Sequence, residues 1–188
     1  MIRAAAALVF AAAVIPGTAK ADYYDEIDRC AAVADLEPRE KCLRSALTQG
    51  DARTEWTYVE YRDSMTDEIT AMAGRYDKSG RNSVNVFCKV GSGDATIAIE
   101  LSGLYQGGRA KAMFRFDDAA PSKVDVIAAR EMVLIAARSE VGPGILSAMR
   151  AASRLRVRID TENTRHEADF SVANYERVHT LLASRCGL

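Results

Sequence analysis

"VNVFCKVGSGDATIAIEL", residues 84–101, is the stretch that decides the fold. Apolar side chains alternate with others on both sides of the turn sequence "GSGD" (91–94), which predicts two strands joined as a β-hairpin. A register that keeps one apolar face on both strands gives the facing pairs Val90–Ala95, Cys88–Ile97, Val86–Ile99 and Val84–Leu101. A slip of one residue would turn the apolar side chains to the other face, so we expect this register and a buried Cys88 thiol.

The same alternation recurs along the chain. It predicts further strands in "EWTYVEYRD" (55–63), "EITAMAGRY" (68–76), "KAMFRFDD" (111–118), "RLRVRID" (154–160) and "HEADFSV" (166–172). The stretch "VDVIAAREMVLIAAR" (124–138) holds a short strand and a continuous apolar run at Met132–Ala136. A short helix is expected over 144–152, and Tyr175, Val178, Leu182 and Cys186 share one face of a C-terminal helix that Gly187 ends. The predicted fold class is α+β, a mainly antiparallel β-sheet or sandwich with an N-terminal helical hairpin and a C-terminal helix.

The first 21 residues have the layout of a signal peptide. Arg3 precedes an apolar run from Ala4 to Ile15, and "AKA" (19–21) then offers small residues to a peptidase before Asp22. The run is shorter than the roughly 20 residues that span a bilayer. We therefore expect residues 1–21 to be removed, a helical hairpin over 22–50 and a β-rich domain over 51–188, in a periplasmic or secreted protein without a stable membrane anchor.

Loss of Arg3 and Lys20 with this leader takes the formal net charge from −1 to −3. A chain this close to neutral lacks the strongly basic balance of a nucleic-acid-binding protein, so no nucleic-acid partner is expected.

Four cysteines in an exported chain predict disulfides. Cys30 and Cys42 lie on two neighbouring predicted helices, the second with Pro38 as its first residue, so they are paired with each other. This leaves Cys88 on a buried strand face and Cys186 on a buried helix face, and a bond between them would tie the C-terminal helix to the sheet. A zinc site needs close spacings such as C-x2-C, which the chain lacks.

No catalytic or cofactor motif is present, so no cofactor, metal or catalytic residue is expected. The only histidines, His166 and His179, have no supporting motif for a cysteine nucleophile. Carboxylates cluster at "IDTEN" (159–163) and at Asp117-Asp118, but calcium-loop spacing is absent and polar turns explain both. Trp56, Tyr58 and Tyr61 could form an aromatic ligand platform, but alternation puts Trp56 and Tyr58 on one strand face and Tyr61 on the other, so part of this set is core.

Arg154, Arg156 and Arg158 form the most conspicuous polar stripe. Guanidinium groups suit an acidic partner, a phosphate or a glycan carboxylate. The simpler interpretation is a solvated strand face whose charges discourage edge pairing. We favour the solvated face because the chain as a whole is not basic, and keep the three arginines as the candidate site for a partner or anion.

Several features together resemble a known group of proteins. A strand opened by Trp56 is followed by "DSMTDE" (63–68), a strand carrying Cys88, "FRFD" (114–117), "LRVRID" (155–160), "ADFSV" (168–172) and a terminal helix with Cys186. This order, over roughly residues 56–186, resembles the small exported accessory proteins of the type VI secretion-associated VasI kind and their uncharacterised relatives. The Cys30/Cys42 hairpin looks like a module that precedes such domains. The resemblance implies a β-rich cell-envelope protein without established catalysis.

The expected function is therefore a non-enzymatic periplasmic interaction or accessory protein with a protein partner in the cell envelope, including a role beside a secretion system. Two other classes stay open. One is an inhibitor that blocks lysozyme-like envelope hydrolases through a loop of a disulfide-braced β domain. The other is an enzyme whose site forms from dispersed residues, which a deep pocket of arginine, histidine and carboxylate side chains would favour.

Overall fold

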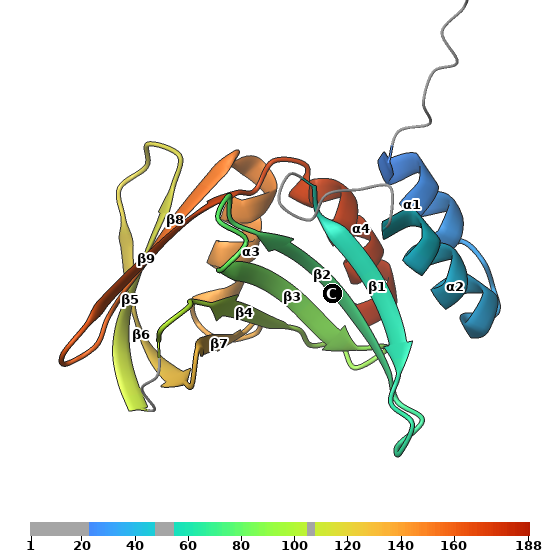
Figure 1. The fold of residues 1–188 in the computed structure, drawn as a ribbon, viewed down its shortest axis with the longest axis horizontal. Coiled ribbons are helices and arrows are strands. Elements are labelled where there is room, and N and C mark those ends of the chain that lie inside the picture. The colour runs from blue at the N-terminus through green and yellow to red at the C-terminus, as the bar shows by residue number, and fades with distance from the viewer. Residues whose placement is uncertain (1–22, 48–54, 105–107) are drawn as a thin grey trace, which may run out of the picture.

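The computed structural model describes residues 23–47, 55–104 and 108–188, so the predicted leader lies outside the described residues. Figure 1 shows the order of elements along the chain. They are α1 (Tyr23–Ala31), α2 (Leu36–Leu47), β1 (Thr57–Arg62), β2 (Ile69–Tyr76), β3 (Ser83–Lys89), β4 (Thr96–Glu100), β5 (Gly108–Phe116), β6 (Ser122–Ala129), β7 (Met132–Ala136), α3 (Gly142–Ala151), β8 (Arg154–Asp160), β9 (Arg165–Ser171) and α4 (Tyr175–Cys186).

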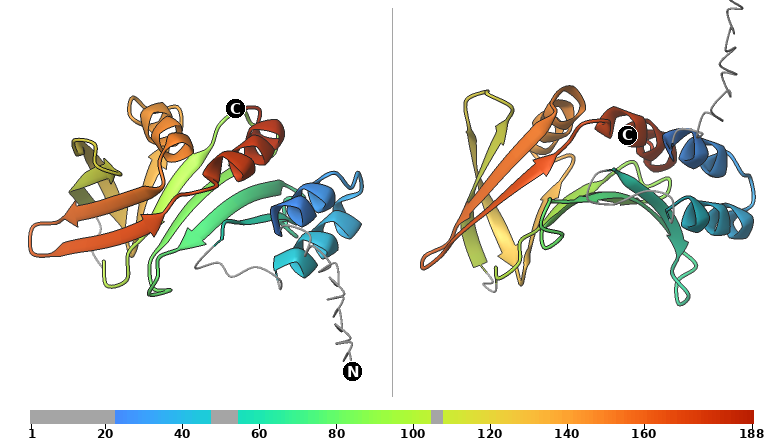
Figure 2. Two further views of the ribbon diagram at one scale, coloured as in Figure 1. Left: turned by 90° about the horizontal axis from the view of Figure 1, so that it is seen from above. Right: turned by 45° about the horizontal axis from the view of Figure 1, so that its top comes forward.

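The described strands form one antiparallel nine-stranded sheet in the order β1-β2-β3-β4-β7-β6-β5-β8-β9. This confirms the α+β class, and of the two arrangements left open by the sequence the structure has the single sheet. The sheet is strongly curved, and α3 and α4 lie on one face of it, with α1 and α2 beside β1 (Figure 2). Helices thus cover the apolar face that a second sheet would cover in a sandwich.

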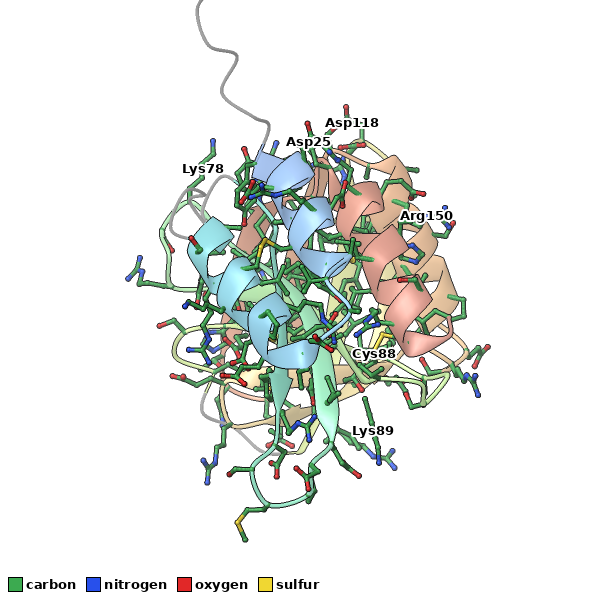
Figure 3. All side chains as sticks on the ribbon, turned by 90° about the vertical axis from the view of Figure 1, so that its right-hand side faces the viewer. Asp25, Lys78, Cys88, Lys89, Asp118 and Arg150 are labelled. Atoms are coloured by element: carbon green, nitrogen blue, oxygen red, sulfur yellow. A yellow bond between two sulfur atoms is a disulfide. The ribbon has the colours of Figure 1, made fainter. Side chains whose placement is uncertain are left out.

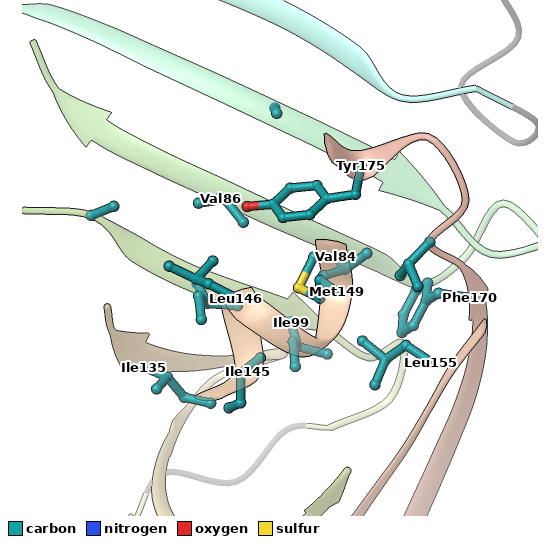
Figure 4. Packing of buried hydrophobic residues seen from close by; sticks show 14 of the residues in the cluster. Val84, Val86, Ile99, Ile135, Ile145, Leu146, Met149, Leu155, Phe170 and Tyr175 are labelled. Carbon is teal, nitrogen blue, oxygen red and sulfur yellow. The ribbon is translucent and has the colours of Figure 1, made fainter. Parts of the chain in front are cut away.

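The core lies between the sheet and the two covering helices. Alternate residues of the strands are buried, as predicted, and meet Ile145, Leu146 and Met149 of α3 (Figure 4). The four residues predicted to share one face of α4 are all fully buried: Tyr175, Val178, Leu182 and Cys186. Gly187 ends α4 in the left-handed conformation, with φ of 74°, as a helix-terminating glycine does.

Two helices begin differently from the prediction. α2 begins at Leu36, so Pro38 lies within its first turn instead of opening it; its missing N–H is harmless there because first-turn amides have no intrahelical acceptor. α3 begins at Gly142, where an added Cβ would lie 2.4 Å from the Ala136 carbonyl oxygen, so only glycine fits against the end of β7.

The predicted register of the β3–β4 hairpin is wrong by two residues. Val86 pairs with Ile97 and Val84 with Ile99, so the connecting segment is longer than the four residues expected. A shift of two residues keeps every side chain on its face, so alternation alone could not exclude it. The loop is held by the end of α4 instead, since Gly91 and Gly93 donate backbone hydrogen bonds to the Arg185 and Cys186 carbonyls at 2.8 and 2.7 Å.

Both predicted disulfides are confirmed. Cys30–Cys42 joins α1 to α2 across 12 residues, and Cys88–Cys186 joins β3 to α4 across 98 residues, with Cα atoms 5.3 and 5.8 Å apart. In the side view, Cys88 of the second bond lies next to the lower end of α4, the end at which Cys186 is located (Figure 3). Among the described residues, no helix combines the length and the apolar composition needed to cross a membrane.

A buried ion cluster ties three elements together around Glu60 of β1, whose side chain is fully buried. Arg39 of α2 meets one carboxylate oxygen at 2.9 Å, and Arg185 of α4 donates to both oxygens at 2.9 Å. Tyr58 donates its hydroxyl to Glu60 at 2.8 Å. Arg39 also donates to two backbone carbonyls between α1 and α2, so one carboxylate connects the helical hairpin, the sheet edge and the C-terminal helix.

Candidate functional site

The arginine stripe of β8 faces away from the core, as predicted. Leu155, Val157 and Ile159 are buried on one side, whereas the side chains of Arg154, Arg156 and Arg158 are 53%, 35% and 32% exposed on the other. The structure shows what the sequence could not, namely that the stripe forms the floor of a groove.

This arginine groove has a volume of about 1030 Å³ and is open to solvent. Its walls and floor come from the β2–β3 turn, β5, β8 and β9. The charged side chains that line it are six cations, Lys78, Arg81, Arg115, Arg154, Arg156 and Arg158, and three carboxylates, Asp77, Glu167 and Asp169. The groove is therefore locally cationic in a chain that carries a small net negative charge.

The β2–β3 turn is held rigidly by Asp77, which is 8% exposed. Its carboxylate accepts hydrogen bonds from the Ser79 hydroxyl at 2.7 Å and from the Asn82 side-chain amide at 2.5 Å. Burial would raise the pKa of Asp77, but these hydrogen bonds outweigh burial and hold it below its usual range. The turn thus presents Lys78 and Arg81 at the groove from a fixed position.

Arg154 is already satisfied within the protein. Its guanidinium binds the Asp169 carboxylate across β8 and β9, with Nε to oxygen distances of 2.8 and 3.0 Å. This hydrogen-bonded pair lowers the pKa of Asp169 and raises that of Arg154. Asp117 accepts the backbone N–H of Arg154 at 2.9 Å and so anchors the start of β8.

The central arginines are less well satisfied. Arg115 and Arg156 are direct cross-strand neighbours, and the Nε atoms of both are buried without a hydrogen-bond acceptor among the described residues. Arg158 contacts Asp160 at 3.2 Å, but Asp160 also pairs with Arg165 at 2.8 Å, which lowers the pKa of this carboxyl. The Nη2 atoms of Arg115 and Arg156 lie 3.9 and 3.7 Å from the exposed Asp118 carboxylate, too far for a hydrogen bond, so an anion in the groove can offer them a closer acceptor.

A smaller hollow of about 210 Å³ adjoins the groove and shares Arg81, Asn82 and Glu167 with it. His166 lies in its lining, and its Nε2 is 3.0 Å from the Thr164 hydroxyl. His179 is instead on α4, where burial lowers its pKa and its ring contacts Tyr175. The two histidines are thus on different parts of the molecule.

The aromatic residues considered as a ligand platform, and a cluster of possible metal ligands, lie outside the groove. Trp56 and Tyr58 are fully buried and Tyr61 is 44% exposed, so they make no aromatic platform. Glu26 lies beside the sulfurs of Cys30 and Cys42, but both sulfurs are in a disulfide and are not available as thiolate ligands.

Sequence reasoning missed Arg115, Lys78 and Arg81 as partners of the stripe. Arg115 lies on a predicted strand, but nothing in the local pattern of that strand predicts that β5 pairs with β8, which follows it only after β6, β7 and α3. In Figure 3, Lys78 and Asp118 both project at the upper end of the molecule, from the turns on either side of this region.

Comparisons with protein-family models, with curated proteins and with solved structures each found no match to this chain.

The Arg154–Asp169 pair predicts a pH dependence of stability. The pKa of Asp169 is lower in the folded than in the unfolded protein, so its contribution is present above about pH 4 and is lost as the pH falls through the folded value. Because the pair is half exposed, we expect it to contribute less than about 1 kcal/mol at pH 7. Urea unfolding at pH 7 and pH 3 should show that the free energy of unfolding falls less between these pH values in Asp169→Asn than in the wild type. Equal losses in both proteins would contradict this assignment.

Proposed function

We propose that this protein is a non-enzymatic interaction module of the cell envelope that binds an acidic partner through the arginine groove. The observation that supports it most directly is the concentration of six cationic side chains around one open groove, two of which, Arg115 and Arg156, stand directly opposite each other. Such guanidinium forks recognise carboxylate and phosphate groups geometrically as well as by charge.

An extracytoplasmic location fits this proposal. The two disulfides are of the kind that form and persist in oxidising compartments, and the leader-like start of the sequence points the same way. An accessory role beside an envelope assembly, such as a secretion system, is the form of this function that the VasI-type resemblance suggests.

The chemistry of the groove favours binding over catalysis. A general acid needs a pKa raised towards neutrality, whereas the pKa values of Asp77 and Asp169 are both lowered. Their carboxylates are occupied by hydrogen bonds from neighbouring side chains. The nearest histidine, His166, lies in the adjoining hollow rather than in the groove's lining.

A second candidate function, inhibition of a lysozyme-like hydrolase, is favoured by the β1–β2 loop. Met65 at its tip is 90% exposed. Asp63 braces the loop by accepting the backbone N–H groups of Met65 and Thr66 at 2.8 and 2.9 Å. A rigid loop with an exposed apolar tip is suited to entering a cleft, because little conformational freedom is lost on binding.

One experiment separates these functions. A photo-crosslinking amino acid is placed in the full chain at Lys78 on the groove, at Met65 on the loop or at Lys41 on α2, and the protein is expressed in its native host. We expect a specific envelope protein to be crosslinked from Lys78, and its yield to fall at least about tenfold when Arg115 and Arg156 are both replaced by glutamate, because like charges then meet.

Crosslinking from Lys41 controls for non-specific capture. A hydrolase of the cell wall captured from Met65 alone would favour the second candidate instead. Absence of a Lys78 adduct, or an adduct that the double charge reversal leaves unchanged, would contradict the groove as the binding surface.

A further inference from the structure

The centre of the arginine groove holds two like charges side by side. Arg115 of β5 and Arg156 of β8 are directly opposite each other in the antiparallel register. Like charges at such a position are destabilising unless a counter-charge is placed between them. The ligand chemistry of the groove therefore depends on what neutralises this pair.

Asp118 is the carboxylate that lies between the two guanidinium groups, but it is hydrogen-bonded to neither of them. Its Oδ1 is 3.9 Å from Nη2 of Arg115 and 3.7 Å from Nη2 of Arg156, both beyond hydrogen-bond distance. The Asp118 side chain is fully exposed at the tip of the β5–β6 turn. Arg156 Nη2 donates instead to the Asp117 backbone carbonyl at 2.7 Å. Asp118 thus occupies the position of a carboxylate ligand without making its hydrogen bonds.

We infer that the groove binds an extended acidic peptide segment of the partner, one of whose carboxylates displaces Asp118 from between Arg115 and Arg156. This inference rests on the proposed function and names the chemistry of its partner. A guanidinium pair of this kind can hold one carboxylate with charge-assisted hydrogen bonds, which the loosely held Asp118 does not provide.

The spacing along β8 specifies where the next carboxylate lies. Arg156 and Arg158 are two residues apart on one strand face, a separation of about 6.6–6.8 Å. An extended peptide presents alternate side chains at the same interval. Acidic residues at positions i and i+2 of the bound segment therefore match these two arginines.

The carboxylates in the groove argue against a uniform polyanion. Glu167 and Asp169 are on β9, directly across from Arg158 and Arg156 respectively, and Asp77 lines the same groove. A ligand with a negative charge at every position would meet these groups and be repelled, whereas a peptide can place a neutral or basic residue opposite them.

Asp118 then acts as a resident competitor of the ligand. Asp118→Asn should raise affinity for an acidic peptide about fivefold, because the competing charge is lost while the arginines remain. Asp125→Asn is the matched control: Asp125 is also an exposed carboxylate with a basic neighbour, but its ion pair is with Lys111, at 3.6 Å, rather than with Arg115 or Arg156. The same change in net charge there should alter affinity less than twofold.

The test uses fluorescein-labelled peptides, the full chain with its disulfides intact, and fluorescence anisotropy at low salt. An alternating Glu-Thr-Glu-Thr-Glu peptide is compared with its block isomer Glu-Glu-Glu-Thr-Thr and with inorganic polyphosphate. We expect the alternating peptide to bind at least threefold more tightly than the block isomer. We expect Arg156→Glu to weaken that binding at least tenfold, whereas Arg109→Glu, on the same face of β5 but outside the groove, should change it less than twofold.

Three results would overturn the inference: no binding of the alternating peptide, equal binding of the two isomers, or tighter binding of polyphosphate than of either peptide. An envelope protein crosslinked from Lys78 in cells would still support the proposed function in each of these cases. Unchanged affinity of Asp118→Asn would exclude Asp118 as the competitor and so also count against the displaced-carboxylate geometry.

Discussion

Replacing Cys88 and Cys186 together by alanine is expected to lower the free energy of unfolding by about 4–5 kcal/mol. The bond closes a loop of 98 residues, and a cross-link over such a length restricts the unfolded chain strongly in the chain-entropy model. The loss is a large part of the total stability of a domain of this size, which is about 5–15 kcal/mol. Denaturant unfolding followed by circular dichroism measures it directly.

The second disulfide provides the comparison. Replacing Cys30 and Cys42 by alanine opens a loop of only 12 residues, so the same relation predicts a loss of about 3 kcal/mol. If the long-loop variant does not fold, the Cys30→Ala/Cys42→Ala variant, compared oxidised and reduced with blocked thiols, gives a second measurement of the Cys88–Cys186 bond alone. A loss for the Cys88–Cys186 pair that is equal to or smaller than the loss for the short loop would contradict the prediction.

Glu60→Ala is expected to lower the free energy of unfolding by about 3–5 kcal/mol, because it leaves the Arg39 guanidinium buried without its counter-ion. The Arg39 side chain is only 5% exposed and cannot reach solvent without moving α2, whereas Arg185, at 30%, can turn outward. The Tyr58 hydroxyl also loses its acceptor, and burial already raises the pKa of this tyrosine above its usual range. Denaturant unfolding again gives the measurement.

Two further variants show whether the buried charge is the cause. Glu40→Ala removes a partly exposed carboxylate that pairs with the exposed Arg44 on α2, and it should lower the free energy of unfolding by less than about 1 kcal/mol. Combining Glu60→Leu with Arg39→Met removes both charges, so the double variant should be more stable than Glu60→Leu alone. If the double variant lost the sum of the single losses, the ion pair would not explain the effect.

The local features of this fold could be predicted from the sequence because they depend on the short periodicities of strands and helices. Alternation in "RLRVRID" assigned each side chain of β8 to the correct face, and helical spacing assigned Cys186 to the buried face of α4. Alternation likewise placed Cys88 on the buried face of β3, and once Cys30 and Cys42 were paired with each other, Cys186 was its remaining partner.

The register of β3 and β4 could not be read in the same way. Side chains repeat every two residues in a strand, so a register and its two-residue shift bury the same faces. The difference was decided by backbone hydrogen bonds from Gly91 and Gly93 to the end of α4, about 95 residues away along the chain. The local sequence pattern cannot predict a contact between segments that are so far apart along the chain.

Only part of the candidate site could be predicted from the sequence, for a related reason. The stripe on β8 follows from one short stretch, but the groove needs β5 beside β8 and the β2–β3 turn above them. Glu60 was similarly hidden: alternation with Tyr58 indicates the buried face, yet its partners Arg39 and Arg185 come from opposite ends of the chain. Strand order and long-range charge pairing are properties of the assembled sheet.

The connectivity of the disulfides has a consequence for how the chain matures. The bonds join the first cysteine to the second and the third to the fourth in order of synthesis. A chain threaded N-terminus first into an oxidising compartment presents Cys30 and Cys42 together, well before Cys88 emerges. In a chain exported as proposed, an oxidase that joins thiols in their order of arrival would make each native bond first, without an exchange of wrong partners.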